Sequence, residues 1–262
     1  MKISILTPTI RPEGLQLVGI GLERQTADNI EWIIGSPFDP KDVFYMGGLI
    51  GGVDIKWVKD DFTGGFWTLN RIYNRMIKES TGDIIVSIQD HTFFTPEAIE
   101  KFVYWIKTHR NYVISGVGDK YDKVYPELGN KVWIDPRKRS SGEIRAVPFD
   151  SIEGNFCAMG RRALYDVGGF DESLDFKGYG MDWYNVLDRI ARQGGYEFYI
   201  DDTNESFSTA HGRVKDWEEN NLLNRGYEVK PVNYLGEVNG IPHREYPYYQ
   251  KVLTPNGHVE VE

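Results

Sequence analysis

A short polar triplet, Gln89-Asp90-His91, directly follows an apolar run at residues 84–88. β-Branched residues dominate this run, IIVSI, which is typical of a strand buried on both faces of a mostly parallel sheet. Open α/β sheets bind ligands beyond the carboxyl ends of their strands, where a carboxylate and an imidazole can share a divalent cation. We therefore expect a metal or ligand site at Asp90. The alternative is that Asp90 caps the helix beginning near Pro96 or closes a turn.

The spacing of apolar residues predicts three further strands and two helices before this triplet. Strands are expected at residues 2–10, 30–35 and 53–58, and helices at residues 15–25 and 66–80. The order is β-α-β followed by β-α-β, which predicts a parallel sheet with right-handed crossovers. The fold class is therefore α/β, with a mostly parallel sheet flanked by helices.

Three segments resemble GT-A type glycosyltransferases, most closely the family-2-like group with a galactosyltransferase-like second half. They are KISILTPTIRPEG, NRMIKESTGDIIVSIQDHTFFTPEAIEKF and NFCAMGRRALYDVGGFDESLDFKGYGMDWYNVLDRIARQGGYEFYI. The resemblance covers residues 1–217. It implies a Rossmann-like GT-A domain that moves a sugar from a nucleotide-diphosphate donor to an acceptor hydroxyl.

The resemblance also suggests a division of the chain. A GT-A domain is expected at residues 1–224, with a nucleotide-sugar-binding half at 1–117 and an acceptor and catalytic half at 151–224. Between the halves, the polar segment 118–150 is expected to form a loop or short hairpin over the site. Residues 225–262 lack a helical period, so we expect an irregular tail that wraps the surface or contacts a partner chain, as in a homo-oligomer.

Members of this family hold Mn²⁺ or Mg²⁺ against the donor diphosphate with a short acidic motif at a strand end. The matching residues here are Gln89, Asp90 and His91, of which only Asp90 is acidic. The resemblance implies that Asp90 and His91 bind the metal and that Gln89 and Asp90 contact the donor. Imidazole suits Mn²⁺ better than Mg²⁺. His211 matches a late-loop histidine that completes the metal site, the alternative being an ordinary surface or core histidine.

Further donor contacts follow from the same resemblance. Thr7, Pro8, Thr9 and Arg11 match the first nucleotide-contacting loop, and Asn74 matches an asparagine that faces the donor. The alternatives are a surface charge for Arg11 and an exposed helix position for Asn74. The residues after the second strand do not match the usual acidic contact to the base, so UDP-linked and GDP-linked donors both stay open.

Asp182 matches the acidic residue at a helix start when the segment is aligned on Arg189. One carboxylate suits an inverting transfer, because a single base removes the proton of the acceptor hydroxyl while that oxygen attacks the sugar carbon. The alternative is an N-cap of the helix YNVLDRIARQ. Tyr179 and Trp183, with Phe176, are candidates for stacking on an acceptor sugar, although aromatic residues, 14% of this chain, are more often core.

The composition of the chain argues against several other classes of protein. A net charge of −9 argues against a broad nucleic-acid footprint, and the single cysteine, Cys157, excludes an internal disulfide. No run approaches the ~20 apolar residues of a membrane span and no signal-peptide pattern is present, so we expect a cytoplasmic enzyme. Two alternatives stay open: a catalytically silent GT-A domain that binds a sugar nucleotide or a partner, and a nucleotidyltransferase-like enzyme. Four classes of acceptor stay open: a glycan, a lipid, a protein or a modified nucleobase.

Overall fold

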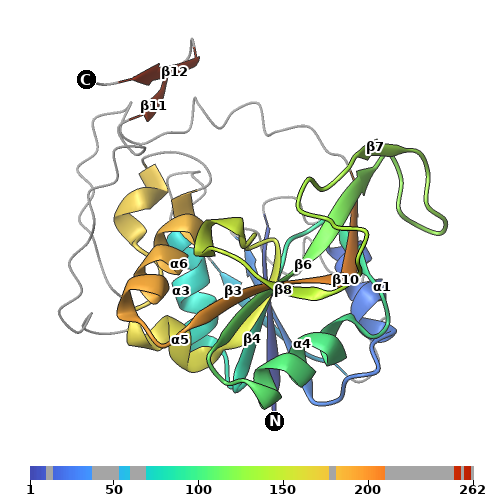
Figure 1. The fold of residues 1–262 in the computed structure, drawn as a ribbon, viewed down its shortest axis with the longest axis horizontal. Helices are drawn as coiled ribbons and strands as arrows, with labels where there is room; N and C mark the ends of the chain where they lie inside the picture. The colour runs from blue at the N-terminus through green and yellow to red at the C-terminus, as the bar shows by residue number, and fades with distance from the viewer. Residues whose placement is uncertain are drawn as a thin grey trace.

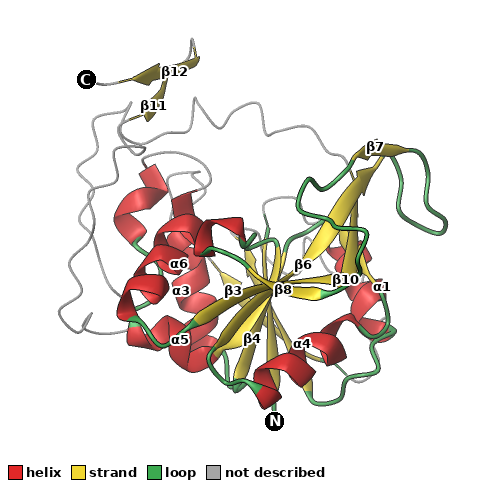
Figure 2. Cartoon of the chain, viewed as in Figure 1, coloured by secondary structure: helices red, strands yellow, loops and turns green. Residues whose placement is uncertain are grey.

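The computed structural model describes residues 1–9, 14–36, 53–59, 69–176, 181–209, 251–254 and 257–260. Within these residues a ten-stranded sheet carries helices on both faces (Figure 1). Helices α3, α5 and α6 cover one face, and α1 and α4 cover the other (Figure 2). The expected α/β class is confirmed.

The first half of the chain forms four parallel strands in the order β3-β2-β1-β4. These strands are β1 (Ile3–Pro8), β2 (Ile30–Ser36), β3 (Asp54–Lys59) and β4 (Ile84–Ile88). Helix α1 (Leu15–Glu23) connects β1 to β2, and α3 (Leu69–Glu79) connects β3 to β4. The parallel β-α-β prediction is correct here because β1, β2 and β4 are buried along their whole length, as their continuous apolar runs indicate.

The second half of the sheet is mixed. It contains β5 (Thr92–Phe94), β6 (Tyr112–Tyr121), β7 (Lys131–Trp133), β8 (Ile144–Ala146), β9 (Phe156–Gly160) and β10 (Glu197–Thr209). Strand β9 lies between β4 and β6 and is antiparallel to both, whereas β10 is parallel to β6. The chain returns from β6 to β9 through short strands and loops rather than a crossover helix, which permits the antiparallel pairing. The expected insertion at 118–150 therefore begins inside β6.

The remaining helical elements are α4 (Ala98–Thr108), η2 (Phe149–Ser151), α5 (Arg161–Asp166), η3 (Glu172–Phe176) and α6 (Met181–Gln193). Within the tail expected to be irregular, β11 (Lys251–Thr254) and β12 (Gly257–Glu260) pair antiparallel as a separate sheet. No helix of the described segments is long and apolar enough to cross a membrane. Cytoplasmic location and homo-oligomer formation stay predictions.

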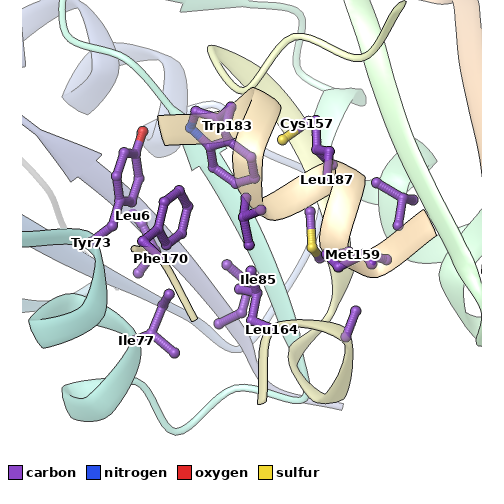
Figure 3. Packing of buried hydrophobic residues seen from close by; sticks show 14 of the residues in the cluster. Leu6, Tyr73, Ile77, Ile85, Cys157, Met159, Leu164, Phe170, Trp183 and Leu187 are labelled. Carbon is purple, nitrogen blue, oxygen red and sulfur yellow. The ribbon is translucent and has the colours of Figure 1, made fainter. Parts of the chain in front are cut away.

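Each face of the sheet has its own apolar core. On the α1 and α4 face, Trp32 and Phe102 are fully buried, and the Trp32 Nε1 donates to Thr7 Oγ1 at 2.9 Å. On the α3 and α6 face, Tyr73 and Leu187 pack with the strands (Figure 3). The second core lies below the start of α6, so packing on this face fixes that helix end.

At the edge of the sheet where the parallel strands begin, a buried carboxylate links their amino ends. Glu31 on β2 is fully buried and accepts from Ser4 Oγ at 2.5 Å and from the Thr81 N–H at 2.6 Å. Its Oε2 also pairs with Lys2 Nζ at 2.8 Å and Lys56 Nζ at 2.9 Å. Burial opposes ionisation of Glu31, but the bonds from Lys2, Ser4, Thr81 and Lys56 outweigh it and hold its pKa well below its usual range.

We predict that Glu31→Gln lowers the free energy of unfolding by about 2 kcal/mol at neutral pH, because it removes hydrogen bonds to a charged group. A lowered pKa stabilises the fold above the ordinary value of 4.5 and loses that contribution as pH falls below it. The difference between wild type and variant should therefore shrink in acid. Urea unfolding followed by circular dichroism measures both effects, with the exposed Glu23→Gln as control. Equal midpoints for wild type and Glu31→Gln would contradict this role.

Candidate active site

Asp90 lies where β4 ends, beside the end of the neighbouring strand β1. It is 4% exposed, and its Oδ2 accepts a hydrogen bond from Thr9 Oγ1 at 2.7 Å. The preceding Gln89 N–H donates to the Asn155 carbonyl at 3.0 Å. Adjacent parallel strands end at the same edge, which explains why residues 81 positions apart meet here. The structure thus brings together Thr7, Pro8, Thr9 and Asp90 from the predicted donor site.

His91 joins this strand end to two other elements. Its backbone adopts a left-handed conformation with φ of 58°, its N–H donates to the Gly14 carbonyl at 3.1 Å, and its carbonyl accepts from the Thr209 N–H at 3.0 Å. A side chain at Gly14 would overlap the His91 ring, so the ring packs directly on the start of α1. The ring thus has a packing role at α1, and its metal role stays a prediction.

Three predicted site residues lie outside the described part of the chain: Arg11, Tyr179 and His211. Strand β10 ends at Thr209, two positions before His211, and the Thr209 N–H donates a hydrogen bond to the His91 carbonyl. The roles of these three residues stay predictions.

Asp182 lies in the first turn of α6, which begins at Met181. A carboxylate is favoured in this turn by the partial positive charge of the helix start. The helix bounds therefore do not support the alternative that Asp182 is the N-cap of this helix. The backbone places Asp182 directly before Trp183, whose side chain reaches the core below.

Residues 167–176, which we call the strap, lead toward the start of α6 and are held by that helix. Arg189, only 1% exposed, donates from Nη1 to the Val167 carbonyl at 2.6 Å and from Nη2 to the Gly169 carbonyl. Its Nε donates to Asn185 Oδ1 at 3.0 Å. The turn needs its glycines, because Gly168 and Gly169 have φ of 74° and 79°. Arg189, which served to align the motif, thus has a structural role.

Helix α3 holds the strap from its other side. The fully buried Asn74 donates from Nδ2 to the Phe170 carbonyl and to Glu172 Oε1, both at 2.9 Å, and accepts from the Phe170 N–H at 2.8 Å. Asp175 accepts from the Asn70 N–H at 2.5 Å and from the Arg71 N–H at 3.0 Å. Asn74 is therefore not an exposed helix residue, and a direct donor contact stays a prediction.

The two acidic residues of the strap have raised pKa values. Burial raises the pKa of Glu172 to about 7, against the bond from Asn74. Burial likewise raises the pKa of Asp175 to about 8, against the hydrogen bonds from Asn70 and Arg71. Both carboxyls are held near the start of α6, so their protonation couples to the stability of this part of the fold.

The other carboxylates near α6 are already engaged. Asp188 is buried and pairs with Arg192 Nε at 2.8 Å. Asp171 accepts from the Ser173 N–H at 3.0 Å and the Ser173 Oγ at 2.7 Å. Asp188 and Asp171 therefore already have protein partners, and the base role of Asp182 stays a prediction.

A cavity of about 290 Å³ lies between the end of β4 and the start of α6. It is lined by Leu69, Gln89, Phe149, Asp150, Ile152, Glu153, Gly154, Asn155, Trp183, Tyr184 and Leu187. Gln89 adjoins Asp90, and Trp183 adjoins Asp182, so one cavity borders both halves of the predicted site. Residues 149–155 were not predicted to line it. Their only local sequence signal is Gly154, where a side chain would overlap the Trp183 ring.

Trp183 is a core residue rather than an open stacking platform. It is 6% exposed, and its ring meets Tyr73 and Phe170 edge-on, with centroids 5.4 Å and 5.0 Å away (Figure 3). Gly154 covers the five-membered ring. The core alternative for Trp183 therefore describes it better than sugar stacking.

Comparisons with known proteins agree with the fold. Residues 67–169 match the model of glycosyl transferase family 2, and no curated protein matches the chain. Among solved structures, GalNAc-T7 with UDP, GalNAc and Mn²⁺ is similar at 13% identity and a TM-score of 0.61, over 83% of this chain and 45% of that one. S. aureus TarS 1–349 with UDP-GlcNAc is similar at 13% identity and a TM-score of 0.60, over 84% and 64%. The chain thus spans less than two thirds of both, and at this identity the likeness shows the fold.

We predict that the raised pKa of Glu172 makes stability depend on pH. The unfolded chain loses this proton near the ordinary value of 4.5, whereas the folded chain keeps it up to about 7, so the free energy of unfolding should fall as pH rises across that window. Glu172→Gln has no such proton and should show a shallower fall. Urea titrations across the window measure the two slopes, with the exposed Glu97→Gln as control. Identical slopes for wild type and Glu172→Gln would contradict the assignment.

Proposed function

We propose that the chain is a family-2-like glycosyltransferase that moves a sugar from a nucleotide-diphosphate donor to an acceptor hydroxyl, with metal and with inversion. The family-model match over residues 67–169 and the likeness to GT-A structures support this proposal. One observation carries this proposal. One cavity is lined both by Gln89, the chain neighbour of Asp90 at the end of β4, and by Trp183, the chain neighbour of Asp182 in the first turn of α6. A donor at Asp90 and an acceptor in the cavity would meet between the two carboxylates.

The residues near Asp90 suit a divalent cation that is shared with the donor. No group of three His, Cys, Asp or Glu side chains is gathered for a metal among the described residues. We propose Asp90 and His211 as protein ligands of the metal. The strand before His211 ends at Thr209, whose N–H donates to the carbonyl of His91, the residue after Asp90. Carboxylate oxygen and imidazole nitrogen both suit Mn²⁺. Bound Mn²⁺ or Mg²⁺ would neutralise charge on the diphosphate.

Asp182 is the proposed general base. Its carboxylate would accept the proton of the acceptor hydroxyl while that oxygen forms a bond to the anomeric carbon. The bond from that carbon to the diphosphate oxygen breaks, and its electron pair leaves with the diphosphate. Attack from the face opposite the leaving group inverts the anomeric carbon. The strap supports this role, because bonds from Arg189 and Asn74 hold the segment leading toward α6.

We predict that Asp90→Ala abolishes the metal-dependent part of donor affinity, because it removes the only carboxylate of the triplet. Calorimetry with UDP, with and without Mn²⁺, measures this, and GDP serves as the second probe. His211→Ala should weaken the same metal-dependent part of donor affinity, whereas the exposed Asp28→Ala should bind the donor as wild type does. If Mn²⁺ strengthens binding equally in wild type and Asp90→Ala, Asp90 is not a ligand.

We predict that Asp182→Asn lowers transfer by at least ~10², since general-base catalysis typically contributes 10² to 10⁴. Donor affinity should stay near that of wild type, because an amide keeps the shape of the carboxylate. Steady-state transfer and calorimetry on the same preparation separate the two, with Asp28→Asn as control. Full transfer by Asp182→Asn would exclude the base role. Donor binding by wild type without any transfer or donor hydrolysis would instead support the silent-domain alternative.

A further inference from the structure

We infer that the cavity between β4 and α6 takes the acceptor as an uncharged sugar ring, and that its carboxylates disfavour a ring that carries phosphate. The inference rests on the proposed function and names the substrate class of that site. It is carried by three features of the cavity: its charges, one buried donor and its size.

The charged side chains that line the cavity are acidic. Asp150 and Glu153 line it, and no lysine or arginine is among its described lining residues. Carboxylates accept hydrogen bonds from sugar hydroxyls but repel phosphate, which is itself an anion without donors at neutral pH. The cavity therefore favours hydroxyl groups over phosphate.

The guanidinium of Arg137, which pairs with Glu153, does not reverse this preference. Arg137 Nη2 lies 3.6 Å from Glu153 Oε2, but Asp135 binds the same guanidinium with two oxygens, at 3.0 Å to Nε and 2.6 Å to Nη2. Its Nη1 faces the Ser151 carbonyl at 3.4 Å. Arg137 is thus committed to protein acceptors, and it fixes Glu153 at the cavity rather than offering a site for an anion.

One polar group beside the cavity has no hydrogen-bond partner within the described structure. The buried Trp183 Nε1 is such a donor. An unpaired buried N–H is costly, and such groups usually find a partner in ligand or water. The Gly154 backbone lies directly on the indole and fixes its position. If the cavity wall shifts to open this buried N–H, a hydroxyl oxygen of a bound sugar would accept from it.

The size and walls of the cavity suit one ring. Its volume of about 290 Å³ lies just below the ~300–1,000 Å³ typical of small-molecule pockets. Phe149 and Tyr184 form one wall, edge to face with centroids 5.3 Å apart, and Leu69 and Leu187 add apolar surface. Such walls match the C–H faces of a pyranose, and the carboxylates match its hydroxyls.

The test measures acceptor binding without depending on the identity of the donor sugar. Saturation-transfer NMR, with Mn²⁺ and UDP present and then absent, follows methyl glycosides of glucose, galactose, mannose and N-acetylglucosamine beside the corresponding free sugar 6-phosphates. At least one neutral glycoside should bind, and every 6-phosphate should bind at least tenfold more weakly than that glycoside. The double variant Asp150→Asn with Glu153→Gln should lower the ratio of the 6-phosphate Kd to the glycoside Kd at least threefold. Glu127→Gln, an exposed carboxylate outside the cavity, should keep the wild-type ratio.

A conservative variant tests the buried donor separately. Trp183→Phe keeps an aromatic ring but removes the N–H, so binding of the neutral glycoside should weaken about three- to tenfold, the value of one neutral hydrogen bond. Circular dichroism and urea unfolding check that each variant is folded. Equal or tighter binding of the 6-phosphates, an unchanged ratio in the double variant, or no binding of any glycoside would overturn the inference. Failure of the proposed function would appear elsewhere, as absence of donor binding or transfer by the wild type.

Discussion

Hydrogen bonds from two helices hold residues 167–176, so this segment ties α3 to α6. Arg189 binds the strap carbonyls from α6, and Asn74 binds the Phe170 backbone and Glu172 from α3. Asp175 adds hydrogen bonds from two backbone N–H groups in the first turn of α3. All of these groups are buried, so each unmade bond would cost the desolvation of a polar group. The strap thus couples the helix before β4 to the helix that carries Asp182.

The two edges of the sheet use charge in opposite ways. At the amino ends of the strands, Glu31 is buried but paired with Lys2 and Lys56, and its pKa is held low. Near the carboxyl ends, burial raises the pKa of Glu172 and Asp175 in the strap. The first arrangement stabilises the fold at neutral pH, whereas the second costs stability as pH rises. Such a cost is common where a protein builds a functional site.

The sequence allowed the first half of the sheet and the place of Asp90 to be predicted, because strands buried on both faces read as continuous apolar runs. It did not allow the antiparallel insertion of β9, since five residues of apolar strand carry no information on direction. The role of Asn74 was also hidden, because its partner Phe170 lies 96 positions away. Trp183 was a candidate for stacking, and only its contacts with Tyr73, Phe170 and Gly154 identify it as core. Long-range contacts of this kind leave no local pattern.

The central claim is that donor and acceptor meet between Asp90 and Asp182, on either side of one cavity. A crystal soaked with Mn²⁺ and UDP, with anomalous data collected at the manganese edge, tests it most directly. The account predicts a single strong anomalous peak within bonding distance of an Asp90 carboxylate oxygen, with the UDP diphosphate on the same ion and its terminal phosphate toward the cavity lined by Gln89 and Trp183. A peak remote from Asp90, or a diphosphate bound away from that cavity, would contradict it.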